Sequence, residues 1–171
     1  IDLAIEGCRQ AGVPLKIVGS GPERAALERV ANGSAQFLGR ASDTELRDLY
    51  RRAMLVLLPG EEDFGIVPLE AQACGRPVVA LGRGGALETV IDGETGVLVD
   101  APSAEAFADA IGRAASRRFD TVAIRRHAEG FSRTRFGDQM QALVRETMRA
   151  DRPDRPEAHA RPEGPRGPVA C

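Results

Sequence analysis

Residues 54–81 read MLVLLPGEEDFGIVPLEAQACGRPVVAL, in which two apolar runs enclose an acidic loop and a short helical segment. The first run, 54–58, is predicted to be a strand buried on both faces, and it ends at Pro59-Gly60 because both residues break regular structure. The second run, 77–81, is predicted to be another buried strand. Functional chemistry is expected to begin at the carboxyl end of the first strand.

The segment between the two strands carries the signals of a helix over 66–73. Gly75 follows at the position where a left-handed residue closes a helix. Pro68 fits only in the first turn, where its missing N–H is not needed. The backbone amides of 64–66 then form a free helix N-terminus, which favours an anion such as a phosphate.

Four carboxylates surround this helix start: Glu61, Glu62 and Asp63 in the loop, and Glu70 on a helix face expected to pack against the sheet. A carboxylate in that position needs hydrogen-bond donors, and sugar hydroxyls supply them. A ribose diol suits one Glu and a hexose suits the other. The plainer alternative is that the loop carboxylates only stabilise the helix N-terminus and that Glu70 is solvated.

The same alternation of strand and helix runs through residue 99. Helices are expected over 2–10, 23–31, 43–52 and 86–91, and further strands over 15–18, 36–39 and 96–99. This order predicts an α/β fold, a Rossmann-like parallel sheet with helices on both faces. Glycine-bearing loops follow three strands, at Gly19-Ser-Gly21, Gly39-Arg40 and Gly84-Gly85, so a nucleotide-like ligand is expected across the strand ends.

Seven residues separate Glu62 from Glu70, and Phe64-Gly65, Glu70-Ala71, 75–79 (GRPVV) and 84–88 (GGALE) follow in the same order as in a known signature. This string resembles the donor site of retaining GT-B glycosyltransferases. The segments 61–66, 70–73 and 84–88 are most similar to mannosyltransferases of O-antigen and exopolysaccharide assembly that use GDP-mannose. The resemblance covers about residues 1–149 and implies the C-terminal, donor-binding half of a two-domain enzyme.

The resemblance also implies roles for individual residues. Glu62 would lie beside the transferred sugar and act by positioning and electrostatic stabilisation, and Glu70 would hold the ribose hydroxyls. The remaining donor-binding residues are the amides of Phe64, Gly65 and Ile66 on the sugar or diphosphate, Gly19 and Gly21 lining the loop, and Arg40 on the base or phosphate. A solvated Arg40 at a helix entry is an equally plain interpretation.

The resemblance implies transfer of a hexose with retention of configuration at the reacting carbon, without a metal or other cofactor. Its partners would be a nucleotide-sugar donor, a glycan or lipid-linked acceptor, and an N-terminal acceptor domain that is missing here together with the family's diphosphate-binding Arg and Lys. The chain alone is therefore expected to be inactive. Alternatives are a UDP- or ADP-hexose donor, or a non-catalytic nucleotide-sugar-binding module.

Two other classes fit the sequence less well. A dinucleotide-binding dehydrogenase needs a third small residue where Arg24 stands. A sugar-nucleotide epimerase needs a Tyr-x-x-x-Lys pair, and Tyr50, the single tyrosine of the chain, has no Lys at that spacing. His127 is interpreted as a helix surface residue.

Composition bounds the remaining possibilities. The 171 residues are 43% hydrophobic and 28% charged with a net charge of −2, which gives no reason to expect nucleic-acid binding. Cys8, Cys74 and Cys171 have no metal or disulfide spacing, so a cytoplasmic location is expected, at the inner membrane face through other parts if at all. The expected domains are 1–130 for nucleotide-sugar binding, 131–149 as a helix crossing to the partner domain, and 150–171 as a disordered Pro/Arg-rich tail.

Overall fold

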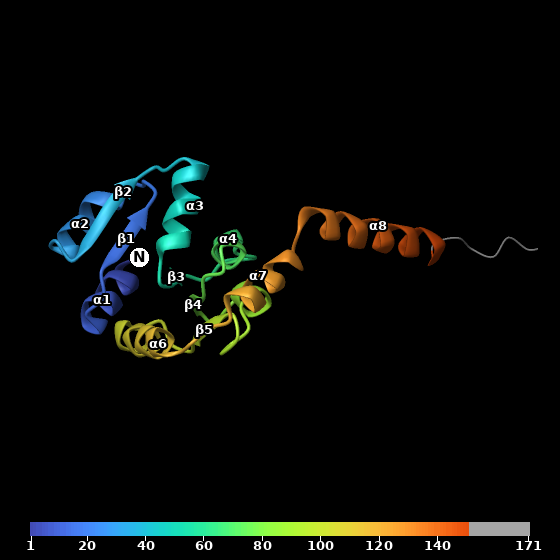
Figure 1. The fold of residues 1–171 in the computed structure, drawn as a ribbon. Helices are drawn as coiled ribbons and strands as arrows, with labels where there is room; N and C mark the ends of the chain where they lie inside the picture. The colour runs from blue at the N-terminus through green and yellow to red at the C-terminus, as the bar shows by residue number, and fades with distance from the viewer. Residues whose placement is uncertain (151–171) are drawn as a thin grey trace, which may run out of the picture. The chain divides into compact units, whose positions relative to one another are not determined.

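The computed structural model describes residues 1–150, and within them strands and helices alternate along the chain (Figure 1). The predicted tail, beyond Ala150, lies outside the described residues. The described chain divides into two units, Ile1–Ser132 and a second that begins at Arg133. No helix of residues 1–150 is long and apolar enough to cross a membrane.

The strands of the first unit form two parallel sheets. β1 (Leu15–Val18) pairs with β2 (Ala35–Gly39). The second sheet has the order β3 (Val56–Leu58), β4 (Val78–Leu81), β5 (Gly96–Val99). Parallel strands with intervening helices confirm the predicted α/β class, although the single predicted sheet is divided into two.

Seven helices connect and cover these strands in the first unit. Their bounds are α1 Asp2–Ala11, α2 Arg24–Ala31, α3 Asp43–Arg52, α4 Ile66–Ala73, α5 Ala86–Thr89, α6 Ala104–Ser116 and α7 Thr121–Glu129. The predicted helix over 66–73 is confirmed as α4, with Gly75 in the left-handed region at φ 72°. The capping signal of α3 is also confirmed, because the Ser42 hydroxyl accepts from the Glu45 amide while the Glu45 carboxylate accepts from the Ser42 amide.

The core lies on both faces of β4, whose four residues are all buried. Alternate side chains point to opposite faces of a strand. Val79 and Leu81 therefore pack on one face with Phe107 and neighbouring residues of α6, whereas Val78 and Ala80 pack on the other with residues of α4 and α5. The three-stranded sheet is thus covered by helices on both faces, as expected.

The predicted strand 54–58 is wrong in length and in burial. β3 begins only at Val56, Met54 is 52% exposed, and Leu58 is the one fully buried residue of the strand. The reason is that β3 is an edge strand, paired within the described chain with β4 alone, so an apolar run does not by itself make a strand central.

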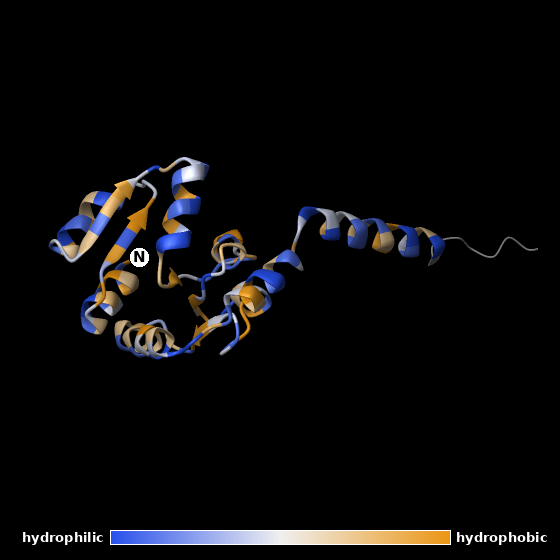
Figure 2. Ribbon diagram, viewed as in Figure 1, coloured by the Kyte–Doolittle hydropathy of each residue, from blue (hydrophilic) through white to orange (hydrophobic). Residues whose placement is uncertain are grey.

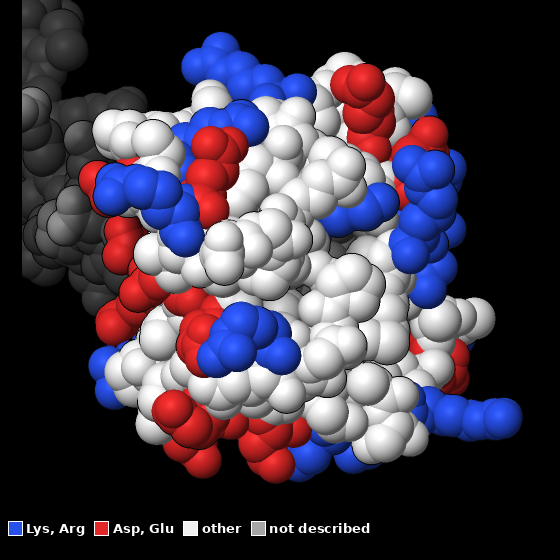
Figure 3. All heavy atoms as spheres, turned by 90° about the vertical axis from the view of Figure 1, so that its left-hand side faces the viewer, with Lys and Arg blue, Asp and Glu red and all other residues white. Residues whose placement is uncertain are grey.

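The outside of the first unit carries both charged and apolar side chains. α3 is mainly hydrophilic along its length, and none of its residues is buried (Figure 2). Acidic and basic side chains are interspersed on the face shown in Figure 3. Some of these opposite charges form ion pairs between neighbouring turns of one helix. Arg9 pairs with Glu6 on α1, and Arg24 pairs with Glu28 on α2.

The second unit consists, among the described residues, of α8 (Arg133–Ala150). Its exposed apolar side chains recur at helical spacing and form one stripe: Phe136, Met140, Leu143, Val144 and Met148. α8 is therefore amphipathic, as predicted for the closing helix.

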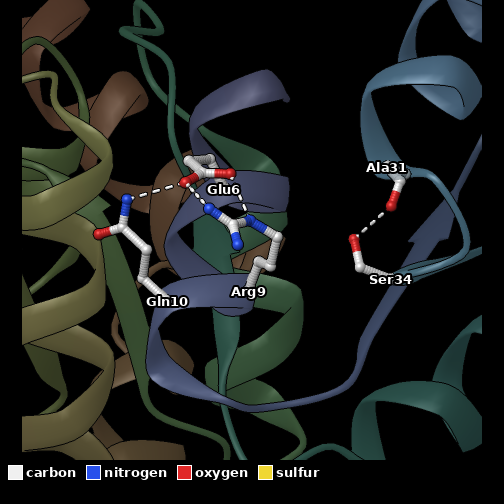
Figure 4. Close-up of polar contacts among 5 residues, drawn as sticks. All are labelled: Glu6, Arg9, Gln10, Ala31 and Ser34. Carbon is white, nitrogen blue, oxygen red and sulfur yellow. Dashed lines mark hydrogen bonds and ion pairs between the residues drawn. The ribbon is translucent and has the colours of Figure 1, made fainter.

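Glu6 gives the first unit a dependence on pH. Hydrogen bonds from Arg9, and then from Gln10, lower the pKa of Glu6 to about 2 (Figure 4). Because the folded-state pKa is lowered, this stabilisation is present above the ordinary pKa of the carboxyl group and is lost as the pH falls from about 5 towards 2. We expect Glu6→Gln to lower the melting temperature slightly at pH 7 and by much less at pH 2.5, in paired thermal melts.

The side chain of Glu6 is 35% exposed to solvent, so the difference at pH 7 should also shrink in about 1 M salt. A difference of equal size at both pH values would show that Glu6 acts through helix propensity and not through its charge.

Candidate functional site

The loops singled out from the sequence all follow the carboxyl ends of strands. In the structure they meet in two pairs. The Gly19 amide donates to the Gly39 carbonyl at 2.7 Å, which joins the loops after β1 and β2. The Gly85 amide donates to the Glu62 carbonyl at 2.7 Å, which joins the loop after β4 to the acidic loop after β3.

The second pair of loops is packed backbone against backbone. A Cβ atom on Gly85 would lie 2.3 Å from the Phe64 Cα, and one on Gly84 would lie 2.4 Å from the Glu62 carbonyl oxygen. Gly84 also has a φ of +53°, a region that L side chains rarely adopt. These two glycines, expected from the sequence to let a ligand approach, let the acidic loop approach instead.

The predicted free N-terminus of α4 is present. Gly65 precedes the helix with φ 80°, and no side chain caps the first turn. The carboxylate of Glu62 turns back over this point, with its Oε2 atom 3.5 Å from the place where a Gly65 Cβ would be. Glu62, Phe64 and Ile66 are exposed, whereas Gly65 between them is buried, so an exposed carboxylate lies beside the helix N-terminus.

Glu70 does not face the sheet, and that expectation is wrong. The buried side of α4 consists of Pro68, Ala71 and Gln72. Glu70, which is exposed, lies on another side of the helix and accepts a hydrogen bond from the Tyr50 hydroxyl at 3.0 Å. The carboxylate is accessible because the turn of about 100° per residue places 70 away from the inward positions 68, 71 and 72.

Arg40 is exposed beside the first pair of loops. It borders a surface hollow of about 310 Å³ between β2 and α3, and the other residues that line this hollow are Leu38, Ala41, Glu45, Asp48, Leu49 and Arg52. Arg24 reaches the same strand end from α2 and donates to the Phe37 carbonyl at 3.4 Å. Arg24 thus braces β2 at the place where a dinucleotide fingerprint would have a small residue.

A buried polar group behind the acidic loop was missed from the sequence. The Thr89 carbonyl accepts from Gln72 Nε2 at 2.7 Å and lies 3.1 Å from His127 Nε2, while the Thr89 hydroxyl donates to the Gly85 carbonyl. His127 is therefore half-buried and not a helix surface residue. The signal was available, since buried Ile124 and Ala128 flank His127 at helical spacing.

Aromatic rings extend this group to the acidic loop. The ring of Phe131 meets the His127 ring edge-on at 5.3 Å between centroids, and it lies 6.2 Å from the ring of Phe64. The residue that follows the acidic carboxylates is thus in contact with the end of α7. Among residues 1–150, no group of three or more His, Cys, Asp or Glu side chains could hold a metal ion.

A parallel α/β fold with glycine loops and an uncapped helix N-terminus at its strand ends is typical of nucleotide-binding domains. Residues 3–117 match the family model described as glycosyl transferases group 1. The chain belongs to this family. Its fold is that of the C-terminal domain of GT-B glycosyltransferases.

Curated relatives agree with this assignment. The D-inositol 3-phosphate glycosyltransferase of Saccharomonospora viridis is 39% identical over 132 residues, which cover 74% of this chain and 31% of that protein. The enzyme of the same name from Mycobacteroides abscessus is 39% identical over 147 residues, covering 77% and 33%. The chain thus spans about a third of the length of these relatives.

Solved structures extend the likeness to the fold. Sucrose-phosphate synthase from Thermosynechococcus elongatus has a TM-score of 0.70 and 29% identity, over 87% of this chain and 42% of that one. Anabaena HepE, solved in complex with UDP and glucose, has a TM-score of 0.62 and 26% identity over 86% and 44%. The lipopolysaccharide outer core galactosyltransferase WaaB, at 16% identity and a TM-score of 0.74, supports the fold alone.

The contact between loops predicts a position-specific effect of adding one methyl group. Gly85→Ala should destabilise the protein by about 1–3 kcal/mol, because its Cβ would overlap the Phe64 backbone. Gly112→Ala is the matched control. Gly112 lies in α6 with nothing near its Cβ position, so this change should stabilise by about 0.5–1 kcal/mol. Urea unfolding midpoints measure both, and equal midpoints for the two variants would contradict the packing of the loops.

Proposed function

We propose that this chain holds a nucleoside diphosphate hexose for a retaining glycosyltransferase, and that the base of the donor is uracil. The observation that carries the proposal is the arrangement around α4, with Glu62 over an uncapped helix N-terminus and Glu70 accessible further along the same helix. Uracil is favoured because HepE, 26% identical, is a complex with UDP and glucose.

In this proposal the diphosphate lies against the amides of Phe64, Gly65 and Ile66. Negative charge develops on the diphosphate as its bond to the sugar breaks, and the helix N-terminus stabilises that charge. Glu62 bonds hydroxyls of the hexose near the reacting carbon. An acceptor oxygen attacks from the face that the diphosphate leaves, and its proton passes to the leaving group.

The ribose and base extend from the helix N-terminus across the other loops. Glu70 accepts hydrogen bonds from the ribose hydroxyls, and Gly19 and Gly21 allow the chain to pass close to the donor. Arg40 contributes a positive charge at the hollow between β2 and α3. GDP-mannose is the second candidate donor, supported by the resemblance of the amino-acid sequences of segments 61–66, 70–73 and 84–88 to GDP-mannose-dependent mannosyltransferases.

The acceptor half belongs to the proposal as well. Because the chain spans about a third of its relatives' length, we propose that a further domain binds the acceptor, a glycan, a lipid-linked saccharide or an inositol phosphate. The apolar stripe of α8 suits a helix that crosses to that domain. Residues 1–130 would then be the donor domain, and this chain alone would transfer no sugar.

Binding of nucleotides tests the proposal directly. UDP at a hundred times its dissociation constant should stabilise the chain by about 2.7 kcal/mol, and GDP or ADP by less, in a thermal-shift titration. Glu70→Ala should reduce the UDP shift. Glu129→Ala, which removes an exposed carboxylate of α7, is the matched control and should keep it.

The same titration separates the candidates. Selective stabilisation by GDP and GDP-mannose would show that the base of the donor is guanine and not uracil. A folded chain that responds to none of these nucleotides would contradict nucleotide-sugar binding altogether.

Glu62 has a separate signature in the enzyme that includes its acceptor half. Glu62→Gln removes the charge near the reacting carbon and keeps the size of the side chain, so kcat should fall about 10²–10³-fold while UDP binding changes little. Steady-state release of UDP and titration of UDP measure the two quantities. If Glu62→Gln kept the kcat of the unsubstituted enzyme, the Glu62 carboxylate would have no part in the chemical step.

A further inference from the structure

Tyr50 is the one described side chain that reaches from another element to a carboxylate of the proposed site. It lies on α3, which packs beside α4 (Figure 1). Its hydroxyl donates to Oε2 of Glu70 at 3.0 Å. Its ring packs against the buried cluster that includes Leu58 and Ala71, so the core holds the ring while the hydroxyl points to the surface carboxylate.

We propose that Tyr50 is a positioning residue for recognition of the ribose. It holds Glu70 in one orientation and occupies one carboxylate oxygen, which leaves the other oxygen to accept from the ribose hydroxyls. This inference rests on the proposed function, because Glu70 is taken to be the ribose ligand.

The physical argument concerns preorganisation. A free Glu side chain populates many rotamers, and a ligand that needs one of them must overcome the lost entropy. A charge-assisted hydrogen bond from a ring fixed by the core restricts Glu70 before the ligand arrives. Burial, and after it the neighbouring Glu70 carboxylate, raises the pKa of the Tyr50 phenol, so the hydroxyl keeps its proton and remains a donor.

A purely structural bond between α3 and α4 is the competing explanation, and nucleotide chemistry distinguishes the two. If Tyr50 acts through Glu70 on the ribose, its hydroxyl matters only for ligands that carry ribose hydroxyls. If it only attaches α3 to α4, its loss affects stability and all nucleotides alike.

The test compares UDP with 2′,3′-dideoxy-UDP by isothermal titration calorimetry. The unsubstituted chain should bind UDP more tightly than the dideoxy compound. Tyr50→Phe, which removes only the hydroxyl, should weaken UDP binding about 5–10-fold, a loss of the size expected for an ordinary hydrogen bond. It should leave the dideoxy affinity within about twofold, and UDP affinity should not fall further when Tyr50→Phe is added to Glu70→Ala.

Ser42→Ala is the matched control on the same helix. It removes the N-cap hydroxyl of α3 and should lower the melting temperature by about 2–4 °C without changing the preference for UDP over the dideoxy compound. A Tyr50→Phe variant that keeps the full preference would overturn the inference while the proposed function stands. Failure of the unsubstituted chain to bind either nucleotide would overturn both.

Discussion

The close contact between two loop backbones is the constraint on which the site depends. Gly84 and Gly85 have no side chains, and the backbone of 62–64 occupies the space that Cβ atoms would fill. The hydrogen bond from the Gly85 amide to the Glu62 carbonyl holds the contact. The position of the Glu62 carboxylate over the start of α4 follows from this contact, because the loop enters the helix only one residue after Phe64.

The loop is supported from behind by buried polar groups and rings instead of by an apolar core. Gln72 and His127 converge on one carbonyl, that of Thr89, and the hydroxyl of Thr89 returns to Gly85. Such a network specifies one arrangement of α4, α5 and α7, since each buried donor or acceptor is costly without a partner. Its cost is visible in the Gln72 Oε1 atom, which is buried without a hydrogen-bond partner among the described residues.

Local signals in the sequence predict the framework of this site well. Pro68 and Gly75 place both ends of α4, and the Ser42 and Glu45 pair places the start of α3, because these residues act through their own backbone geometry. The orientation of Glu70 and the burial of His127 were predicted wrongly. The orientation of Glu70 depends on which neighbouring helix lies beside it, and periodicity along α4 alone cannot supply that information. The spacing of Ile124, His127 and Ala128 along α7 did carry the signal for His127.

The spacing of the two carboxylates also acquires a physical meaning from α4. Glu62 precedes the helix, and Glu70 is its fifth residue, about 6 Å along the axis from Ile66 at 1.5 Å per residue. A diphosphate placed at the helix N-terminus would have the sugar on the side of Glu62 and the ribose on the side of Glu70. The fixed rise of α4 therefore sets how far the ribose ligand Glu70 lies from the helix N-terminus, where the proposed diphosphate would bind. Tyr50 would then serve only the far end, since Glu62 is already held by its loop and Glu70 projects from an exposed helix surface.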